Sequence, residues 1–302
     1  MSGSMHSVFS GLKVTFDTPL SRFSTVRIGG GARIFVRAGS EEDVRLFLEA
    51  CHAAGCRYFI LGGGSNVLFD DRGFDGAVLH FGREMAQIYR EGNRVFAQSG
   101  ARLYGIYDCC RYYDLGGGEF LRNIPASLGG AIYNNAGCFG HDMSCITEKI
   151  YAVSRREKKV FEKDEAEFAY RKSFFQKNRE WIITGALLNF HEGFDEAAAE
   201  EISFRKRKTQ PLGSPSLGSV FKREGDVIPA MVIDRLGLKG LCVGGAQVSR
   251  VHANFIVNAT RKATCDDYLS LMEIITGEVE RYAGVILTPE VEHLEYRGGF
   301  FV

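Results

Sequence analysis

Two short glycine-rich segments combine small residues with hydrogen-bonding side chains, a composition suited to holding phosphate groups. Residues 61–66 read LGGGSN, and residues 124–137 read IPASLGGAIYNNAG. Glycine lacks a Cβ, so backbone amides there can approach phosphate oxygens closely. Neither the alternating glycines of the dinucleotide fingerprint nor the Gly-Lys-Ser/Thr of a P-loop is present in the first segment. Each segment alone is as often a packed turn as a ligand site, but two together fit a long dinucleotide.

Three further residues have side chains suited to chemistry, each with a plainer alternative. The guanidinium of Arg171 could present two parallel donors to a carboxylate, although a surface salt bridge is the simpler reading. Ser219 lies in a loop without the Gly-x-Ser-x-Gly elbow of hydrolases, so an ordinary loop serine is the alternative. Glu290 has apolar neighbours, and burial would favour a neutral carboxyl that donates a proton. A strand-end glutamate in water is the plainer interpretation.

The composition limits the classes of partner. Basic and acidic residues each number 37, so no global charge draws the chain to nucleic acid or to an anionic membrane. Any bound anion must therefore be held locally. The one basic run, residues 205–208, is predicted to be a solvated helix face, although it could lie near an anionic ligand. The eight cysteines show no metal or redox spacing and His252 has no metal-type partner, so we expect reduced thiols and no metal.

Predicted strands and helices are mixed along the chain, and they must position these residues. A length of 302 residues suggests two or three packed units. No apolar run approaches the roughly 20 residues that span a bilayer, and no leader pattern opens the chain, so we expect a cytoplasmic protein. Residues 116–140 are predicted to be a long ordered loop or a short helix wrapped by turns, and a domain boundary is placed near residue 200. Apolar periodicity predicts strands at 32–38, 58–61, 77–81, 94–98, 149–153, 159–161 and 181–190, with short ones near Gln247 and Phe255. It predicts helices at 103–114, 195–208, 228–236 and 265–282, and one capped by Ser40.

Eight ordered segments together resemble the family of UDP-N-acetylenolpyruvoylglucosamine reductases, over about residues 23–291. Each segment is weak alone, whereas chance agreement of all eight in order is hard to credit. They are TVRIGGGA (25–32), LGGGSNVL (61–68), EFLRNIPASLGGAIYNNAGCFG (119–140), YRKSF (170–174), QPLGSPSLGSVFK (210–222), GLKGLCVGGAQVS (237–249), HANFIVN (252–258) and PEV (289–291).

The resemblance implies an α+β fold of three parts. Two subdomains of the vanillyl-alcohol oxidase (PCMH) type, residues 5–78 and 79–200, would clasp FAD, and the second would be joined by the C-terminal segment 285–302. Residues 201–284 would form an α+β domain that binds the UDP-sugar and is inserted before the final strand. Arg171 and Ser219 are only 48 positions apart, which is similar to the shorter type II form of the family, without its substrate-capping loop.

The implied activity is that of UDP-N-acetylmuramate dehydrogenase. NADPH, through non-covalent FAD, would reduce UDP-N-acetylglucosamine enolpyruvate to UDP-N-acetylmuramate for peptidoglycan and cell wall synthesis. Arg171 would oppose the charge on the substrate carboxylate, a protonated Glu290 would add a hydrogen bond to the same oxygens, and Ser219 would protonate the α carbon. We expect a monomer whose partners are these small molecules, with no nucleic acid and no membrane.

The resemblance also assigns binding residues. For FAD they are Gly62, Gly63, Gly64, Ser65, Asn66, Ile124, Pro125, Ser127, Gly129, Gly130 and Gly137. For the substrate they are Tyr170, Lys222, Lys239 and His252. Two departures from the family pattern are Thr288, where a glutamate is common, and Arg223, which puts substrate contacts at that position in doubt. Cys138, in the flavin loop, is not expected to attach the flavin.

Two other functions compete with this one. A flavin-dependent oxidase of the same fold would reoxidise with oxygen alone, and many such enzymes hold their flavin covalently. A catalytically silent nucleotide-sugar binding protein would lack turnover. The joint presence of Arg171, Ser219 and Glu290 argues against the silent protein.

Overall fold

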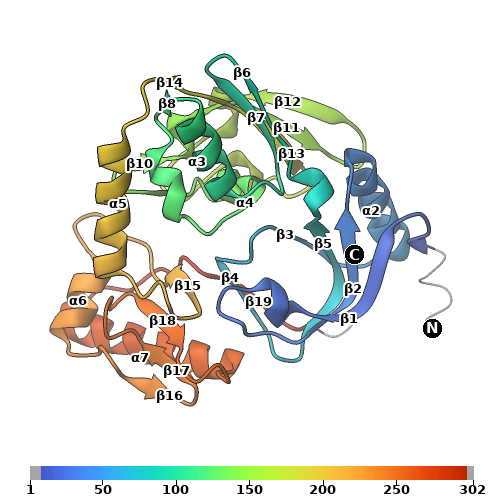
Figure 1. The fold of residues 1–302 in the computed structure, drawn as a ribbon. Helices are drawn as coiled ribbons and strands as arrows, with labels where there is room; N and C mark the ends of the chain where they lie inside the picture. Colours follow the sequence, from blue (N-terminus) through green and yellow to red (C-terminus); the bar gives the residue numbers. More distant parts are fainter. Residues whose placement is uncertain (1–7, 298–302) are drawn as a thin grey trace.

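The computed structural model of the protein describes residues 8–297, so the outer ends of the predicted ranges 5–78 and 285–302 lie outside it. Three sheets of four or five strands, with covering helices and three two-stranded sheets, make up the described part of the fold (Figure 1), which confirms the mixed α+β prediction. The first sheet has the order β1-β2-β5-β3, antiparallel between β1 and β2 and parallel elsewhere. Its elements are β1 (Lys13–Pro19), β2 (Gly31–Ala38), α2 (Glu41–Ala54), β3 (Tyr58–Leu61) and β5 (Phe74–Phe81).

Helix α2 shows why the sequence starts and ends it where it does. The Ser40 hydroxyl accepts a hydrogen bond from the Asp43 amide, which satisfies a free donor of the first turn. Gly55 ends the helix in the left-handed conformation, with φ of 57°. Val44, Phe47, Leu48 and Cys51 recur at helical spacing and are buried in the core with side chains of the first sheet.

The second sheet is antiparallel, with the order β12-β11-β13-β7-β6. Residues 116–140, predicted to be a loop or a short helix, form short helical and extended pieces that pack on this sheet's core. The strands are β6 (Ile88–Glu91), β7 (Arg94–Gln98), β11 (Thr147–Val153), β12 (Lys158–Glu162) and β13 (Ile182–Asn189). The covering pieces are α3 (Leu103–Tyr112), β8 (Leu115–Gly116), η3 (Glu119–Asn123), α4 (Leu128–Tyr133), β9 (Gly137–Cys138), β10 (His141–Asp142) and β14 (His191–Glu192).

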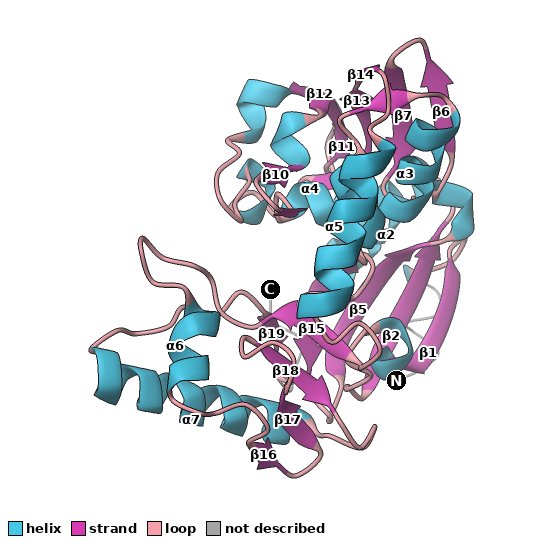
Figure 2. Cartoon of the chain, turned by 60° about the vertical axis from the view of Figure 1, so that its left-hand side comes forward, coloured by secondary structure: helices cyan, strands magenta, loops and turns pink. Residues whose placement is uncertain are grey.

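Helix α5 (Glu196–Thr209) leads from the second sheet to the third and bridges the two in both views (Figures 1 and 2). The third sheet is antiparallel with the order β15-β18-β17-β16. Its core also takes Val26 and Ile28 from the N-terminal part of the chain. The elements are β15 (Ser216–Ser219), α6 (Pro229–Arg235), β16 (Cys242–Val243), β17 (Ala246–Val248), β18 (Phe255–Asn258) and α7 (Cys265–Ala283).

The chain returns to the N-terminal part of the fold after the third sheet. Strand β19 (Glu292–Leu294) pairs in parallel with β4 (Val67–Phe69). The C-terminal segment therefore pairs with a strand in the range predicted for the first subdomain, whereas we expected it to join the second. Because β5 continues to Phe81, we propose a first boundary after that residue rather than at 78.

Tyr268 of α7 carries a polar group with no partner in the core of the third sheet. Its side chain is 0% exposed, and its hydroxyl has no hydrogen-bond partner within residues 8–297. Burial raises the pKa of this phenol. An unsatisfied buried hydroxyl costs about 1 to 3 kcal/mol, so Tyr268→Phe is expected to stabilise the protein. We expect its urea denaturation midpoint to rise, while Tyr112→Phe, at a position 81% exposed, leaves the midpoint unchanged. A lower midpoint for Tyr268→Phe would show that the hydroxyl is hydrogen-bonded.

Candidate active site

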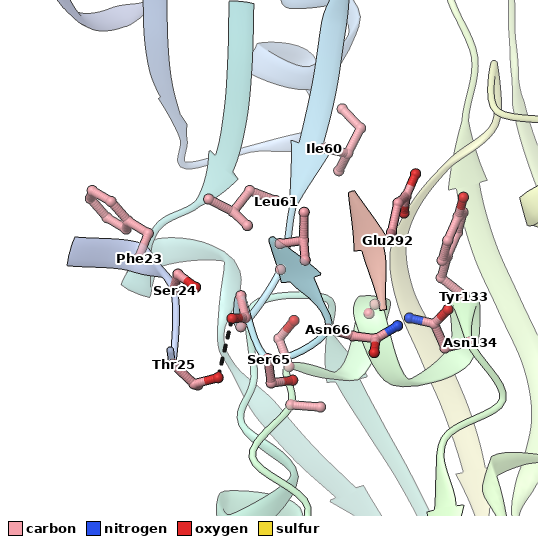
Figure 3. A pocket seen from close by; sticks show the side chains of 18 of the residues that line it. Phe23, Ser24, Thr25, Ile60, Leu61, Ser65, Asn66, Tyr133, Asn134 and Glu292 are labelled. Atoms are coloured by element: carbon pink, nitrogen blue, oxygen red, sulfur yellow. Dashed lines mark hydrogen bonds between the residues drawn. The ribbon is translucent and has the colours of Figure 1, made fainter. Parts of the chain in front are cut away.

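The two glycine-rich segments, far apart in sequence, meet in the structure. The turn after β3 packs directly on the loop before α4, because a Cβ at Gly62 would lie 2.6 Å from the Ser127 hydroxyl. His80 on β5 donates from Nδ1 to the Leu61 carbonyl at 3.0 Å and so fixes the start of the turn. Figure 3 shows Ser65 on this turn, between the segment that carries Thr25 and the helix that carries Tyr133. The two predicted phosphate-binding segments therefore form one surface.

This surface fits a phosphate-bearing cofactor such as FAD. The Ser127 hydroxyl is buried without a hydrogen-bond partner within the described residues. The main-chain amides of Gly63, Gly64 and Ser65 also donate no hydrogen bond to any protein group within residues 8–297. Free donors and glycines without a Cβ are what a bound pyrophosphate requires. All of the residues assigned to FAD line one cavity of about 2200 Å³. Since ordinary ligand pockets measure roughly 300 to 1,000 Å³, it has room for a cofactor and a second ligand.

The charge of the cavity differs from that of the whole chain. Although the net charge is zero, basic side chains greatly outnumber acidic ones in the cavity wall. The acidic ones are Glu180, Glu290 and Glu292. Such a wall attracts anionic ligands, and the low-dielectric surroundings focus its field. The expectation that anions are held locally therefore has a structural basis.

Main-chain pairing brings Ser219 and Glu290 into the same wall. Just after β15, Val220 accepts a hydrogen bond from the Glu290 amide at 2.7 Å, and Lys222 donates its amide to Thr288 at 2.9 Å. Asn254 fixes Phe221, the residue after Val220. Its side-chain amide accepts a hydrogen bond from the Phe221 amide and donates one to the Phe221 carbonyl. The Ser219 hydroxyl makes no hydrogen bond within residues 8–297, so it is free to act on a ligand.

Arg171 approaches Glu290 from the second sheet's side of the cavity. Its Nε donates to Glu290 Oε1 at 2.6 Å, and its second terminal nitrogen donates to the Gly137 carbonyl at 3.1 Å. The two side chains are 22% and 15% exposed, so the Glu290 carboxylate is largely buried and faces the Arg171 guanidinium in addition to its apolar sequence neighbours. Arg171 has φ of 55°, in a tight turn closed by the hydrogen bonds between Ala169 and Lys172. Such a left-handed non-glycine residue is typical of functional sites.

Asn66 has a partner within the protein. Its side-chain amide donates to the main-chain carbonyl of Glu290 at 3.0 Å, although we assigned it to the pyrophosphate. Figure 3 shows its side chain facing Asn134. The glycine-rich turn that is suited to a cofactor therefore also positions the segment that carries Glu290.

The four residues assigned to the substrate do not line this cavity. The Tyr170 ring lies under the Arg171 guanidinium, 5.1 Å away, and is exposed. Lys239 pairs with Asp234 at 2.8 Å on the third sheet's side, and His252 lies near both. Burial, aided by Lys239, lowers the pKa of His252. Lys222 contacts the segment that carries Glu290 through its main-chain amide, which donates to the Thr288 carbonyl. Their contact with substrate therefore stays a prediction.

The structure adds cavity residues that the sequence did not single out. Lys206, read as part of a solvated helix face, is instead buried in the cavity wall. Its burial follows the helical spacing of Ala199 and Ser203, which was the available signal. Arg179 also lines the cavity and pairs with Glu292 on β19 at 2.9 Å. That pair has no signal in the local sequence.

Gly64 offers a test of the glycine-rich turn. A Cβ there would lie 1.7 Å from the Phe23 carbonyl oxygen, whereas at Gly92, with a similar positive φ, it would meet nothing within 4 Å. Both alanine variants share a left-handed penalty of about 1 to 2 kcal/mol. We expect Gly64→Ala to lower the melting temperature further and to abolish retention of FAD, whereas Gly92→Ala keeps its FAD. Equal FAD content and equal melting temperatures would show that the turn tolerates displacement.

Comparison with known proteins agrees with this geometry. Residues 32–151 match an FAD binding domain, and residues 210–294 match the C-terminal domain of UDP-N-acetylenolpyruvoylglucosamine reductase. The fold and the basic, glycine-lined cavity define the class, a flavin-dependent oxidoreductase with the vanillyl-alcohol oxidase (PCMH) type of FAD-binding fold and a C-terminal α+β domain.

Relatives along nearly the whole chain identify the family. A UDP-N-acetylenolpyruvoylglucosamine reductase of Chlamydia pneumoniae is 36% identical, over 92% of this chain and 91% of its own length. One of Pseudothermotoga lettingae is 36% identical, over 93% of this chain and 97% of its own. The solved structure of the reductase from Thermus caldophilus superposes with a TM-score of 0.80 at 27% identity, covering 94% of this chain and 99% of its own. The chain belongs to the family of UDP-N-acetylenolpyruvoylglucosamine reductases.

Proposed function

We propose that the protein reduces UDP-N-acetylglucosamine enolpyruvate to UDP-N-acetylmuramate with NADPH and bound FAD, as a UDP-N-acetylmuramate dehydrogenase of peptidoglycan precursor synthesis. The observation that carries this function is the meeting of Arg171, Ser219 and Glu290 in the cavity that the two glycine-rich loops also line. Family membership and the matched FAD binding domain support the same reaction. The large basic cavity suits two anionic ligands.

The chemistry divides between cofactor and protein. When bound, FAD supplies the hydride transfer from NADPH to the β carbon of the enol ether. Arg171 offers a fork of donors to the substrate carboxylate, where negative charge builds. Of its five N–H groups, Nε donates to Glu290 and one terminal group to Gly137, which leaves others for the ligand.

Glu290 holds Arg171 in orientation, and its carboxyl, when protonated, donates a hydrogen bond to the same substrate oxygens. Val220 accepts from its main-chain amide and the Asn66 side chain donates to its main-chain carbonyl, so its segment is held on both sides and little reorganisation accompanies the reaction. Ser219 then delivers a proton to the α carbon. A hydroxyl is a weak acid, so it serves only because the intermediate is strongly basic and the donor is positioned.

We infer that the protein is a cytoplasmic monomer whose partners are the UDP-sugar and NADPH. The substrate would span from the cavity toward the Lys239, Asp234 and His252 cluster of the third sheet. Within the described residues, no helix is long and apolar enough to cross a membrane.

A stopped-flow experiment without oxygen tests this function. Mixing the purified protein with NADPH should bleach the flavin absorbance, and only addition of the enolpyruvyl sugar should restore it. Restoration by oxygen alone, with no response to the sugar, would indicate an oxidase. A colourless protein that binds the UDP-sugar would indicate the silent binding protein.

A further inference from the structure

The turn that carries Arg171 holds this residue in an unfavourable backbone conformation. Ala169 and Lys172 exchange main-chain hydrogen bonds across the turn, at 3.2 and 3.0 Å, so Arg171 is its third residue. A positive φ at the third residue of a turn favours glycine or asparagine, whereas Arg171 adopts φ of 55° with a long side chain. Such a conformation persists only where surrounding contacts hold it. The orientation of the guanidinium therefore depends on what binds the backbone of this turn.

The side chain of Gln176 binds this backbone. Its Nε2 donates to the main-chain carbonyl of Arg171 at 3.3 Å and to the side-chain oxygen of Asn134 at 3.1 Å. Gln176 ends the short helix η6 (Phe174–Gln176), and the hydroxyl of Ser173, just before that helix, donates to the last carbonyl of α4 at 2.7 Å. Gln176 is half-buried and does not belong to the described residues that line the cavity. It can therefore hold Arg171 without contacting a ligand.

Carboxamide side chains hold the main-chain carbonyls of both Arg171 and Glu290. Gln176 holds the carbonyl of Arg171 and is itself bound to Asn134, in the second glycine-rich segment. Asn66, in the first segment, donates to the Glu290 carbonyl at 3.0 Å, and its side chain faces Asn134 (Figure 3). The side chains of Arg171 and Glu290 then meet at 2.6 Å. Each partner of this ion pair is therefore tied through its backbone to one of the two glycine-rich segments.

We propose that Gln176 is a positioning residue for reduction of the enolpyruvyl sugar, because it holds the turn that orients the Arg171 guanidinium. The inference rests on the function proposed above, in which Arg171 opposes the charge that builds on the substrate carboxylate. A displacement of about 1 Å at such a donor costs on the order of 10²-fold in rate. Reduction of FAD by NADPH builds no charge on a carboxylate. Loss of the Gln176 amide therefore affects only the half-reaction with the sugar.

The test replaces Gln176 with methionine, which has a similar length and volume but no N–H donor. We expect Gln176→Met to retain FAD and to be reduced by NADPH at the wild-type rate. Its reoxidation by saturating enolpyruvyl sugar should be slower by about tenfold or more. Rapid mixing without oxygen measures the two half-reactions separately. Gln87→Met makes the same change at an exposed position outside the cavity and should behave as wild type.

A double-mutant cycle distinguishes positioning of Arg171 from a general loss of packing. In the Arg171→Met background no guanidinium remains to be oriented, so adding Gln176→Met should slow reoxidation by less than about twofold. A glutamine with only a structural role would instead slow the Arg171→Met protein as much as it slows the wild type. Gln176→Lys, whose ammonium can donate to the same two oxygens, should recover part of the rate.

Two results would overturn the proposal. One is a Gln176→Met protein that the sugar reoxidises at the wild-type rate, and the other is a loss that persists in full in the Arg171→Met background. If the methionine variant holds no FAD, Gln176→Glu decides, because it keeps the shape and polarity of the side chain but turns an acceptor toward the Arg171 carbonyl. Wild-type reoxidation of Gln176→Glu contradicts the idea, and a selective loss supports it. Failure of the proposed function is a separate observation, a wild-type protein without FAD or one that the sugar does not reoxidise.

Discussion

Ser219→Ala is expected to stop the half-reaction with the enolpyruvyl sugar while sparing the half-reaction with NADPH. Ser219 lies at the end of β15 in the cavity wall, with a hydroxyl that has no protein partner within the described residues. Its removal deprives the α carbon of its proton donor, and general acid catalysis contributes about 10²- to 10⁴-fold. Rapid-mixing measurements should show flavin bleaching by NADPH at the wild-type rate and reoxidation slowed by that factor.

Two variants make the result for Ser219 specific. Ser219→Cys retains a transferable proton and should recover part of the rate. Ser270→Ala makes the same change on α7, outside the cavity, and should behave as wild type. If Ser219→Ala slows reduction by NADPH and reoxidation by the sugar equally, the residue serves the cofactor site and not protonation.

Arg171→Met is expected to lower kcat for the sugar by about 10²- to 10³-fold, the usual loss when one preorganised donor to a developing anion is removed. The variant also leaves Glu290, only 15% exposed, without its cationic partner. We therefore expect a lower melting temperature as well. The rate of reoxidation by the sugar after NADPH reduction is the measurement that separates these effects.

Arg171→Lys is the matched control, because it keeps the charge at the same left-handed backbone position but loses the planar fork. It should retain the melting temperature better than Arg171→Met and still turn over slowly. Arg207→Met, on the exposed face of α5, should be unaffected in both measurements. Wild-type turnover by Arg171→Lys would show that a positive charge at this position is enough for catalysis. The prediction that the guanidinium binds the substrate carboxylate through two hydrogen bonds would then be wrong.

Much of the fold could be predicted because its elements carry local signals. The strands 58–61 and 94–98 have the predicted bounds, and the helix after Ser40 has the predicted cap. Strand β1 was missed, since its residues are mostly exposed and show no buried alternation. The two-residue strands and β19 were also missed, because so short a pairing depends on its distant partner.

By itself the sequence determined the family, the glycine-rich turns and the chemical types of Arg171, Ser219 and Glu290. Only the tertiary structure decided how they meet. Arg171 reaches Glu290 across 119 positions, and Asn66 reaches it across 224. Such pairs have no local signature, because they depend on how segments far apart in the chain pack together. The burial of Lys206 was likewise decided by what packs against α5, since a basic run on a helix is equally consistent with a solvated face.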